Sequence, residues 1–264
     1  MDPDALRDLL DAKYDQYNHP RFIEHDPISI PHLFTARADV EVAGFFAAII
    51  AWGRRDLIIR SARDLMARMD MQPHDFVQHA SEDDLDRLRG FVHRTFNETD
   101  ARALVLALRG IYQQHESLEA IFVQDLDPGA DAWTRICAAR ARLVAATDFP
   151  ARSGKHLADP ATGASAKRLN MYLRWMVRRD QRGVDFGLWT GIQPSQLVCP
   201  LDVHTGNVAR ALGLLDRRQN DRKAATLLTD ALRRLHPEDP VRYDFSLFGL
   251  GVFEGMGKNA AGQP

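Results

Sequence analysis

Apolar side chains recur at helical spacing along most of this chain, and that periodicity limits the fold more than any other feature. In the segment that follows Thr99-Asp100, residues Leu104, Leu108 and Ile111 fall on one helix face. Residues 40–52 are almost wholly apolar, as expected for a helix at the centre of a core. Because no segment alternates apolar and polar residues over a useful length, we predict an all-α fold.

Capping residues and helix breakers give the expected limits of the helices. Asp2 followed by Pro3 starts the first one, since aspartate caps a helix and proline suits its first turn. Gly53 separates the helix at 40–52 from the next one. Further helices are expected at residues 57–69, 99–112, 117–123, 132–146, 166–178, 203–215, 221–235 and 243–253.

Composition excludes several classes of protein. With 264 residues, 45% of them hydrophobic, the chain can bury one large core or two smaller ones. No run of about 18 apolar residues could span a membrane, and the acidic start Met1-Asp2-Pro3-Asp4 is unlike a signal peptide. Cys137 and Cys199 are too few for a four-cysteine iron–sulfur cluster, and no Cys-x-x-Cys pair indicates zinc. We therefore expect a cytoplasmic protein that carries neither a metal nor another cofactor.

The charge of the chain is nearly balanced, but its distribution is uneven. The net charge is −2, which does not indicate a nucleic-acid-binding protein. Residues 151–182, however, hold eight basic side chains against Asp159 and Asp180. The basic residues are Arg152, Lys155, Lys167, Arg168, Arg174, Arg178, Arg179 and Arg182. This segment suits a phosphate-binding surface, and the alternative is an ordinary solvated helix face.

Two residues in particular could carry chemistry. Asp202 stands between Pro200-Leu201 and an apolar helix, and Lys167 opens another helix further upstream. A lysine, unlike an arginine, can lose its proton and become a nucleophile, and both a helix N-terminus and burial favour the neutral amine. A lysine and an aspartate at the starts of two helices could attack a deoxyribose C1′ and assist the loss of a base.

Each of these residues also fits a purely structural role when it is considered alone. Lys167 is then a surface lysine on an amphipathic helix, and Asp202 is a helix N-cap. His204, in the first turn after Asp202, would bond a backbone group. The function therefore depends on whether the chain brings Lys167 and Asp202 together.

The surroundings of Asp202 resemble those of the catalytic aspartate in helix-hairpin-helix DNA glycosylases. The matching residues are Leu201-Asp202-Val203-His204 followed by Asn207-Val208-Ala209-Arg210. In those enzymes the aspartate lies at a helix N-terminus, but the usual lysine position is occupied here by Gly183 or Val184. The archaeal 8-oxoguanine glycosylase branch has a longer interval between lysine and aspartate, and the interval from Lys167 to Asp202 looks like that arrangement.

The resemblance is incomplete around the hairpin that gives those enzymes their name. The Leu-Pro-Gly-Val-Gly hairpin is absent, and residues 159–165 stand in its place. Gly163 and Ser165 keep this segment small, so its backbone N–H groups could still approach a phosphate.

Nearly the whole chain also resembles a bacterial family of unassigned function. The matching segments are residues 91–96, 167–178 and 243–251. Similarity to the glycosylases is firm only over about residues 163–214, so the two resemblances differ greatly in extent.

The glycosylase resemblance implies a fold and a set of DNA contacts. It implies one helix-hairpin-helix glycosylase-like domain over residues 1–256, followed by a flexible tail at 257–264. The domain would consist of two helical subdomains, roughly 35–150 and 151–256, and an N-terminal helix, with the active site in the cleft between the subdomains. The expected DNA-binding residues are Trp52, Arg54, Arg55, Gly163, Ser165, Arg168 and His204.

Residues 51–55 close the apolar helix at 40–52, where the glycosylases approach DNA. Trp52 would stack on a base, and Arg54 and Arg55 would reach phosphates. Alternatively, Trp52 belongs to the core and both arginines are solvated. His93 and Arg94 are a further candidate phosphate contact, with a helix-end contact as the alternative.

The resulting hypothesis is a base excision repair enzyme. The protein would be a DNA glycosylase with AP-lyase activity that removes an oxidised purine, 8-oxoguanine above all, from damaged double-stranded DNA. Lys167 would form a Schiff base and Asp202 would assist it. A monofunctional glycosylase, in which Asp202 activates water, and a non-catalytic DNA- or RNA-binding protein are the alternatives. We expect a monomer that associates with the nucleoid in the cytoplasm and binds no membrane.

Overall fold

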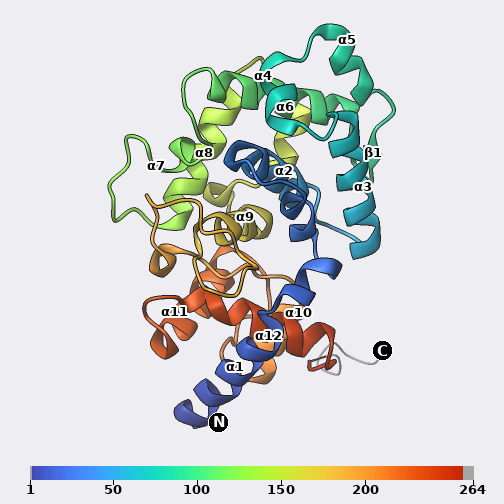
Figure 1. The fold of residues 1–264 in the computed structure, drawn as a ribbon. Coiled ribbons are helices and arrows are strands. Elements are labelled where there is room, and N and C mark those ends of the chain that lie inside the picture. Colours follow the sequence, from blue (N-terminus) through green and yellow to red (C-terminus); the bar gives the residue numbers. More distant parts are fainter. Residues whose placement is uncertain (1, 258–264) are drawn as a thin grey trace. The chain divides into compact units, whose positions relative to one another are not determined.

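The chain folds mostly as helix, as the periodicity predicts. The computed structural model describes residues 2–257, with 62% helix and 2% strand (Figure 1). Of the tail expected at 257–264, residues 258–264 lie outside the described residues. No helix within 2–257 has the length and apolar character needed to cross a bilayer.

Contacts divide the chain into two compact units. Unit 1 is formed by the residues up to Phe22 and those from Pro160 onward, and unit 2 is Ile23–Asp159. The expected arrangement, two subdomains at 35–150 and 151–256 with an active site between them, stays a prediction.

Unit 1 contains five α-helices and several short 3-10 turns within its described part. The helices are α1 (Pro3–Tyr17), α9 (Lys167–Val177), α10 (Val203–Ala211), α11 (Arg222–Leu235) and α12 (Asp244–Val252). The 3-10 turns are η6 (Pro160–Thr162), η7 (Pro194–Gln196) and η8 (Pro240–Tyr243). Helix α12 packs against both α1 and α10. Gly249 permits the first contact, because a Cβ at this position would lie 2.0 Å from the Tyr17 ring.

Unit 2 contains the remaining helices and one hairpin. The helices are α2 (Arg37–Ile49), α3 (Arg55–Arg68), α4 (Pro73–His79), α5 (Glu82–Leu85), α6 (Glu98–Tyr112), α7 (Ala120–Val123) and α8 (Ala132–Ala145). The 3-10 turns are η2 (Pro27–Ser29), η3 (Pro31–Leu33), η4 (Asp86–Leu88) and η5 (Ala151–His156), and η1 (Pro20–His25) precedes them across the boundary with unit 1.

The periodicity misses α4 and the hairpin of unit 2. Strands β1 (Val92–His93) and β2 (Phe96–Asn97) pair antiparallel, with His93 opposite Phe96. Strands of two residues are too short to show an alternating pattern. The turn between them places Arg94 at a φ of 56°, a left-handed conformation that an arginine in the sequence does not predict.

A buried carboxylate organises the core of unit 2. Helix α2 is buried over nearly its whole length, and Glu41 is fully buried within it. Its carboxylate accepts hydrogen bonds from the Tyr112 hydroxyl at 3.0 Å, the Ser117 hydroxyl at 2.6 Å and the Leu118 N–H at 2.9 Å. It also pairs with Arg37 at 3.0 Å. These bonds hold residues 117–118 outside a helix, which explains why the helix expected at 117–123 begins only at Ala120.

We expect Glu41→Leu to destabilise the protein by about 2 to 4 kcal/mol, because the change leaves the buried Tyr112 hydroxyl and Leu118 N–H without an acceptor. Urea denaturation measures the loss. The exposed Glu116 is the matched control, and Glu116→Ala should shift the free energy of unfolding by no more than about 0.5 kcal/mol. Equal effects from both changes would contradict the structural role of Glu41.

Candidate active site

The two candidate catalytic side chains lie together in unit 1. The ammonium Nζ of Lys167 donates to Oδ2 of Asp202 at 3.2 Å. Both side chains retain some solvent access, with 34% of Lys167 and 17% of Asp202 exposed. Lys167 is the first residue of α9, and Asp202 immediately precedes α10. A lysine and a carboxylate are therefore in contact at the N-termini of two helices.

Asp202 serves as the N-cap of α10 at the same time. Its Oδ1 accepts the Thr205 N–H at 2.8 Å, which leaves Oδ2 for Lys167. Its backbone carbonyl accepts from the Asn220 side chain at 3.1 Å and from the Gly206 N–H at 2.9 Å. The capping role and the pairing with lysine are thus compatible, because they use different carboxylate oxygens.

The surroundings of Asp202 favour its ionised form. Burial raises the pKa of this carboxyl, but the positive charge of Lys167, the Thr205 N–H and the Lys167 hydrogen bond outweigh burial. The pKa of Asp202 therefore lies below its ordinary value of 3.8. The carboxylate is charged at neutral pH and can stabilise a cation beside it.

The backbone immediately before Lys167 is strained. Ala166 is buried and has a φ of 43°, in the left-handed region that an alanine rarely adopts. Asn170 stabilises this turn, since its side-chain amide donates to the Ser165 carbonyl at 3.0 Å. The strained turn sets where α9 begins and therefore where Lys167 points.

Gly163 and Ser165 belong to the segment that replaces the hairpin. Gly163 is exposed with a φ of 90°, and its carbonyl accepts the Arg222 N–H at 2.9 Å, which brings it to the start of α11. A shallow hollow here is lined by Gly163, Asp221, Arg222, Lys223, Thr226 and Leu227. The expected phosphate contact at Gly163 and Ser165 is therefore accessible in part, and its function stays a prediction.

Arg168 and His204 lie beside the two candidate catalytic residues. Burial lowers the pKa of Arg168 to about 10, so this side chain remains charged at neutral pH. His204 is exposed in the first turn of α10, and its charge helps to lower the pKa of Asp202. Its backbone packs against α12 at Gly251, where an added Cβ would lie 3.2 Å from the His204 Cβ and 3.3 Å from the His204 carbonyl oxygen.

The other three expected DNA contacts, Trp52, Arg54 and Arg55, lie in unit 2. The Trp52 ring stacks on His156, with ring centroids 5.6 Å apart and planes 25° apart, and meets the edge of His93. Stacking on a base would therefore need the indole face opposite His156. Arg54 is exposed and pairs with Asp56 at 2.7 Å. Arg55 is the first residue of α3 and is partly buried.

A buried ionic cluster, which the charge pattern of the sequence does not predict, lies behind the Lys167–Asp202 pair. Arg174 lies two turns after Lys167 on α9 and donates to Asp244 at 2.5 Å. The thiol of Cys199, three residues before Asp202, donates to the other oxygen of Asp244 at 3.9 Å. Burial raises the pKa of Asp244 to about 6, Arg174 opposes this change and the charge of Asp202 adds to it. Asp244 thus links α12 to α9 and to the segment that carries Asp202.

Arg178 forms the second part of this cluster. It donates to Asp185 at 2.7 Å, to Asp239 at 2.8 Å and to the Tyr14 hydroxyl at 2.8 Å. Burial lowers the pKa of Arg178, but the surrounding carboxylates raise it by a larger amount, so the pKa lies above its ordinary value. The expectation of a solvated or phosphate-binding face at 151–182 is therefore wrong for Arg174 and Arg178, because both side chains are buried against carboxylates. The sequence signal that could have predicted their burial is a pair of arginines four residues apart within the mostly apolar segment 169–178.

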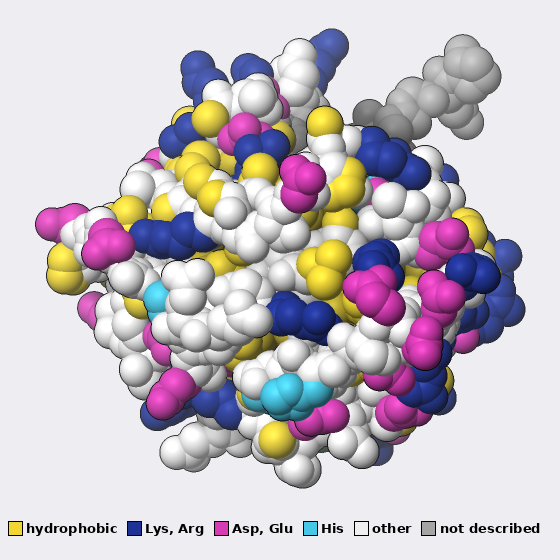
Figure 2. All heavy atoms as spheres, turned by 90° about the horizontal axis from the view of Figure 1, so that it is seen from above, with side chains coloured by type: hydrophobic (Ala, Val, Ile, Leu, Met, Phe, Trp, Pro, Cys, Tyr) yellow, Lys and Arg dark blue, Asp and Glu magenta, His cyan; other side chains and the backbone are white. Residues whose placement is uncertain are grey.

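Charge elsewhere on the molecule is mixed. On the face seen in Figure 2, acidic and basic side chains are interleaved, without a broad field of one sign on that face. Any attraction for a polyanion must therefore come from local groups rather than from the net charge.

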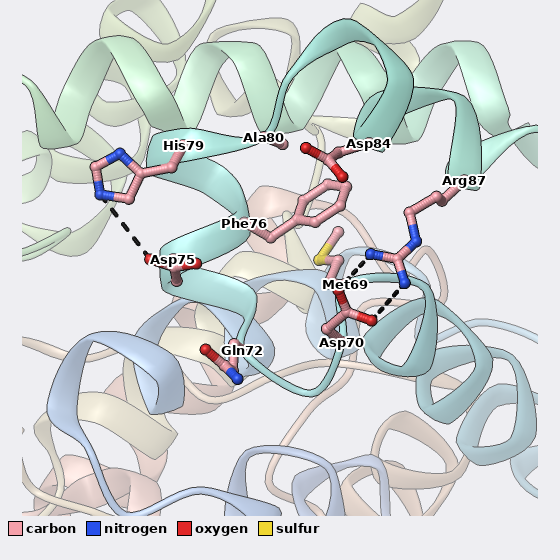
Figure 3. Close-up of a pocket in the computed structure, with 9 residues that line it drawn as sticks. All are labelled: Met69, Asp70, Gln72, Asp75, Phe76, His79, Ala80, Asp84 and Arg87. Carbon is pink, nitrogen blue, oxygen red and sulfur yellow. Dashed lines mark hydrogen bonds and ion pairs between the residues drawn. The ribbon is translucent and has the colours of Figure 1, made fainter.

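A separate pocket in unit 2 has lining charges that are already satisfied (Figure 3). Asp70 pairs with Arg87 and Asp75 approaches His79, while Asp84 accepts from Ser81. The lining residues are Met69, Asp70, Gln72, Asp75, Phe76, His79, Ala80, Asp84 and Arg87. Within residues 2–257, three or more histidine, cysteine, aspartate or glutamate side chains do not gather in a group that could hold a metal.

The fold and the site define a mostly helical protein with a lysine–aspartate pair at two helix N-termini. Residues 26–253 match the family described as "Protein of unknown function (DUF2400)", and the chain belongs to that family. Comparisons with curated proteins and with solved structures give no match.

We expect Asp244 to make stability fall as pH rises from about 4 to about 6. Its pKa is about 6 in the folded protein and about 3.8 when unfolded, so the folded state holds the extra proton in this range. The stability that this proton contributes is fully present below the pKa of the unfolded chain and is lost as the pH rises through the pKa of the folded protein. Asparagine does not titrate, so the free energy of unfolding of Asp244→Asn should rise relative to that of wild type as the pH increases over this range.

Urea denaturation at several pH values checks this expectation. Asp221→Asn is the control: the Arg217 hydrogen bond lowers the pKa of Asp221, so the stability difference from wild type should change little between about pH 4 and 6. A constant difference for Asp244→Asn as well would show that Asp244 does not titrate in this range.

Proposed function

We propose that this protein is a DNA glycosylase with AP-lyase activity, in which Lys167 is the nucleophile and Asp202 its carboxylate partner. The single observation that carries the proposal is the 3.2 Å contact between Lys167 Nζ and Asp202 Oδ2. The resemblance of the Asp202 and Lys167 segments to helix-hairpin-helix glycosylases supports it. We further propose the helix-hairpin-helix glycosylase fold, with the protein acting as a monomer on nucleoid DNA in the cytoplasm.

The target nucleotide must first leave the duplex, because the C1′ atom of a stacked nucleotide is out of reach of a side chain. Flipping costs a few kcal/mol, and the cost is lower for a damaged or mispaired base. Gly163, Ser165, Arg168 and His204 are the proposed DNA contacts of unit 1. Arg168 remains charged at neutral pH and lies next to Lys167 in sequence, so it can neutralise a phosphate near the flipped nucleotide.

The chemistry begins with a proton transfer from the Lys167 ammonium. Asp202 is its acceptor in the structure and passes the proton on to the departing base. The neutral amine then forms a bond from Nζ to C1′, while the bond from C1′ to the base breaks and its electrons leave with the base. Ionised Asp202 stabilises the positive charge that develops on the sugar.

The second stage opens the sugar and cleaves the strand. The bond from C1′ to O4′ breaks, O4′ takes up an amine proton, and a protonated Schiff base links Lys167 to C1′. Asp202, ionised again after the base has left, takes a proton from C2′; a C2′–C3′ double bond forms while the C3′–O3′ bond breaks, and its electrons leave with the 3′ phosphate in a β-elimination. Water hydrolyses the Schiff base and restores the lysine.

The proposed substrate is an oxidised purine, with 8-oxoguanine as the first candidate. This part of the proposal follows the resemblance to the archaeal 8-oxoguanine glycosylase branch. Duplexes that each carry one different lesion, read with and without alkaline treatment, would identify the base that is removed and separate base release from strand cleavage.

We expect borohydride to trap a covalent adduct between the wild-type protein and damaged duplex DNA, and Lys167→Gln to abolish it. The reason is that only a primary amine can form the reducible Schiff base. Lys13→Gln is the control, since Lys13 lies on α1 and pairs with Glu254. An adduct that persists in Lys167→Gln would sink the assignment of the nucleophile.

We expect Asp202→Asn to slow base release by roughly 10² to 10⁴-fold with little loss of stability. Asparagine caps a helix about as well as aspartate, so the substitution removes the charge and keeps the cap. Single-turnover assays measure the rate. Asp131→Asn is the matched control, because Asp131 caps α8 through the same kind of bond, from the Thr134 N–H at 2.8 Å. Equal rates in the wild type and Asp202→Asn would refute the catalytic role.

Two other results would redirect the proposal. An abasic product without strand cleavage, together with full activity in Lys167→Gln, would indicate a monofunctional enzyme in which Asp202 activates water. Tight DNA binding with no lesion processed by the wild type would indicate a non-catalytic DNA-binding protein.

A further inference from the structure

The hairpin of unit 2 holds an arginine in an unusual position. Arg94 occupies the turn between β1 and β2 with a φ of 56°, a conformation that costs a non-glycine residue about 1 to 3 kcal/mol. Its side chain lies across Gly53: a Cβ added to Gly53 would be 2.9 Å from Nη1 and 3.2 Å from Cδ of Arg94. Gly53 itself has a φ of 101°, so two left-handed residues meet at this point.

The rest of the hairpin is firmly anchored. The buried His93 bridges two segments, with Nδ1 3.0 Å from the Ser61 hydroxyl and Nε2 3.1 Å from the Trp52 carbonyl. Burial lowers the pKa of His93, and Arg94 adds to this effect, so the neutral ring donates from Nε2 to the carbonyl and accepts at Nδ1. Phe96 is buried against His156. A strained turn on so rigid a base presents Arg94 in a defined place.

The described part of the fold gives the Arg94 guanidinium no polar partner that would offset this strain. Arg94 is exposed, and within residues 2–257 its guanidinium has no hydrogen-bond or ion-pair partner. A charged side chain that is held rigidly and left open is suited to an external anion.

Further basic side chains belong to the segments next to the Gly53 turn. The stacking of Trp52 on His156 brings η5 beside the Gly53 turn, and η5 contributes Arg152 and Lys155. We call the set Arg54, Arg55, Arg94, Arg152 and Lys155 the hairpin surface. Two nearby carboxylates are already engaged, since Asp56 pairs with Arg54, and Asp100 is buried beneath Arg152 and His156. The hairpin surface is therefore locally positive on a protein whose net charge is −2.

We propose that the hairpin surface binds the sugar–phosphate backbone of duplex DNA, with Arg94 as its main phosphate contact. A planar guanidinium matches a phosphate through two parallel hydrogen bonds. The inference rests on the proposed function for its choice of polyanion, and it assigns the binding to residues outside the Lys167–Asp202 site.

The composition of the surface favours duplex DNA over other polyanions. Single strands bind by stacking bases on aromatic rings, but one face of Trp52 is covered by His156. Interfaces between proteins usually have an apolar centre. Among the described residues of the hairpin, Val92 is the one large apolar side chain that is exposed. Interfaces with DNA are more polar and more positive, as this one is.

Binding of the full chain to a short undamaged DNA duplex, followed by fluorescence anisotropy over a range of salt concentrations, tests the proposal. We expect Arg94→Asn to weaken binding and to make the slope of log K against log salt shallower by about 0.9, the loss of one phosphate contact. Asparagine adopts a left-handed backbone more readily than most residues, so the turn should survive. Unchanged melting of Arg94→Asn checks this, and Arg94→Gly serves as a second variant free of backbone strain.

Arg89→Asn is the matched control: Arg89 is an exposed arginine of the same unit that pairs with Asp86, and its loss changes the net charge equally. Equal effects of Arg94→Asn and Arg89→Asn on affinity and slope would overturn the proposal. Arg94-dependent binding that is tighter to a single strand, or to an acidic polypeptide, than to the duplex would overturn it as well.

The lesion assay keeps this proposal separate from the catalytic one. Lys13→Gln, which removes the same charge outside both proposed sites, should retain wild-type affinity for the duplex and the wild-type salt slope. Arg94-dependent duplex binding by a protein that processes no lesion would leave the hairpin surface intact and refute the glycosylase. Lesion processing by a protein whose duplex binding ignores Arg94 would do the reverse.

Discussion

The architecture of unit 1 depends on two buried arginines, Arg174 within α9 and Arg178 directly after it. Arg174 and Arg178 lie four residues apart, and their guanidinium groups are surrounded by Asp244, Asp185 and Asp239. An unpaired charge in such a place would cost several kcal/mol, so each arginine requires its carboxylates to be present and correctly oriented. The cluster therefore fixes α9 against the start of α12 and the loop at 185. Lys167 begins the same helix, so its position is set by the same constraint.

The candidate site follows from this arrangement. Asp244 engages Arg174 on α9 and Cys199 just before Asp202, while α12 packs directly on α10. The helix that starts with the lysine and the helix that follows the aspartate are thus tied to the same third helix. The two carboxyls are driven apart in acidity, because Asp202 has a cation and an N–H beside it, whereas Asp244 is deeply buried. A charged Asp202 next to an amine is the condition that Schiff-base chemistry would need.

Unit 2, like unit 1, depends on buried polar side chains that fix the positions of its segments. Glu41 is satisfied entirely by groups of the same unit and fixes the loop before α7. His93 and His156 hold the Trp52 ring between them and support the hairpin. These buried polar groups fix the positions of neighbouring segments, among them the hairpin that carries the proposed hairpin surface.

The sequence by itself determined the helical class, most helix limits and two local roles. Asp202 before an apolar helix is a cap in the structure, and Lys167 does begin a helix, because capping and helix initiation depend on neighbours a few residues away. Only the tertiary structure decided that Lys167 and Asp202 touch, that Arg174 and Arg178 are buried, and that Trp52 faces His156. The Lys167–Asp202, Arg174–Asp244 and Trp52–His156 contacts join residues 35 to 104 positions apart, and the periodicity of a single segment carries no information about partners at that distance.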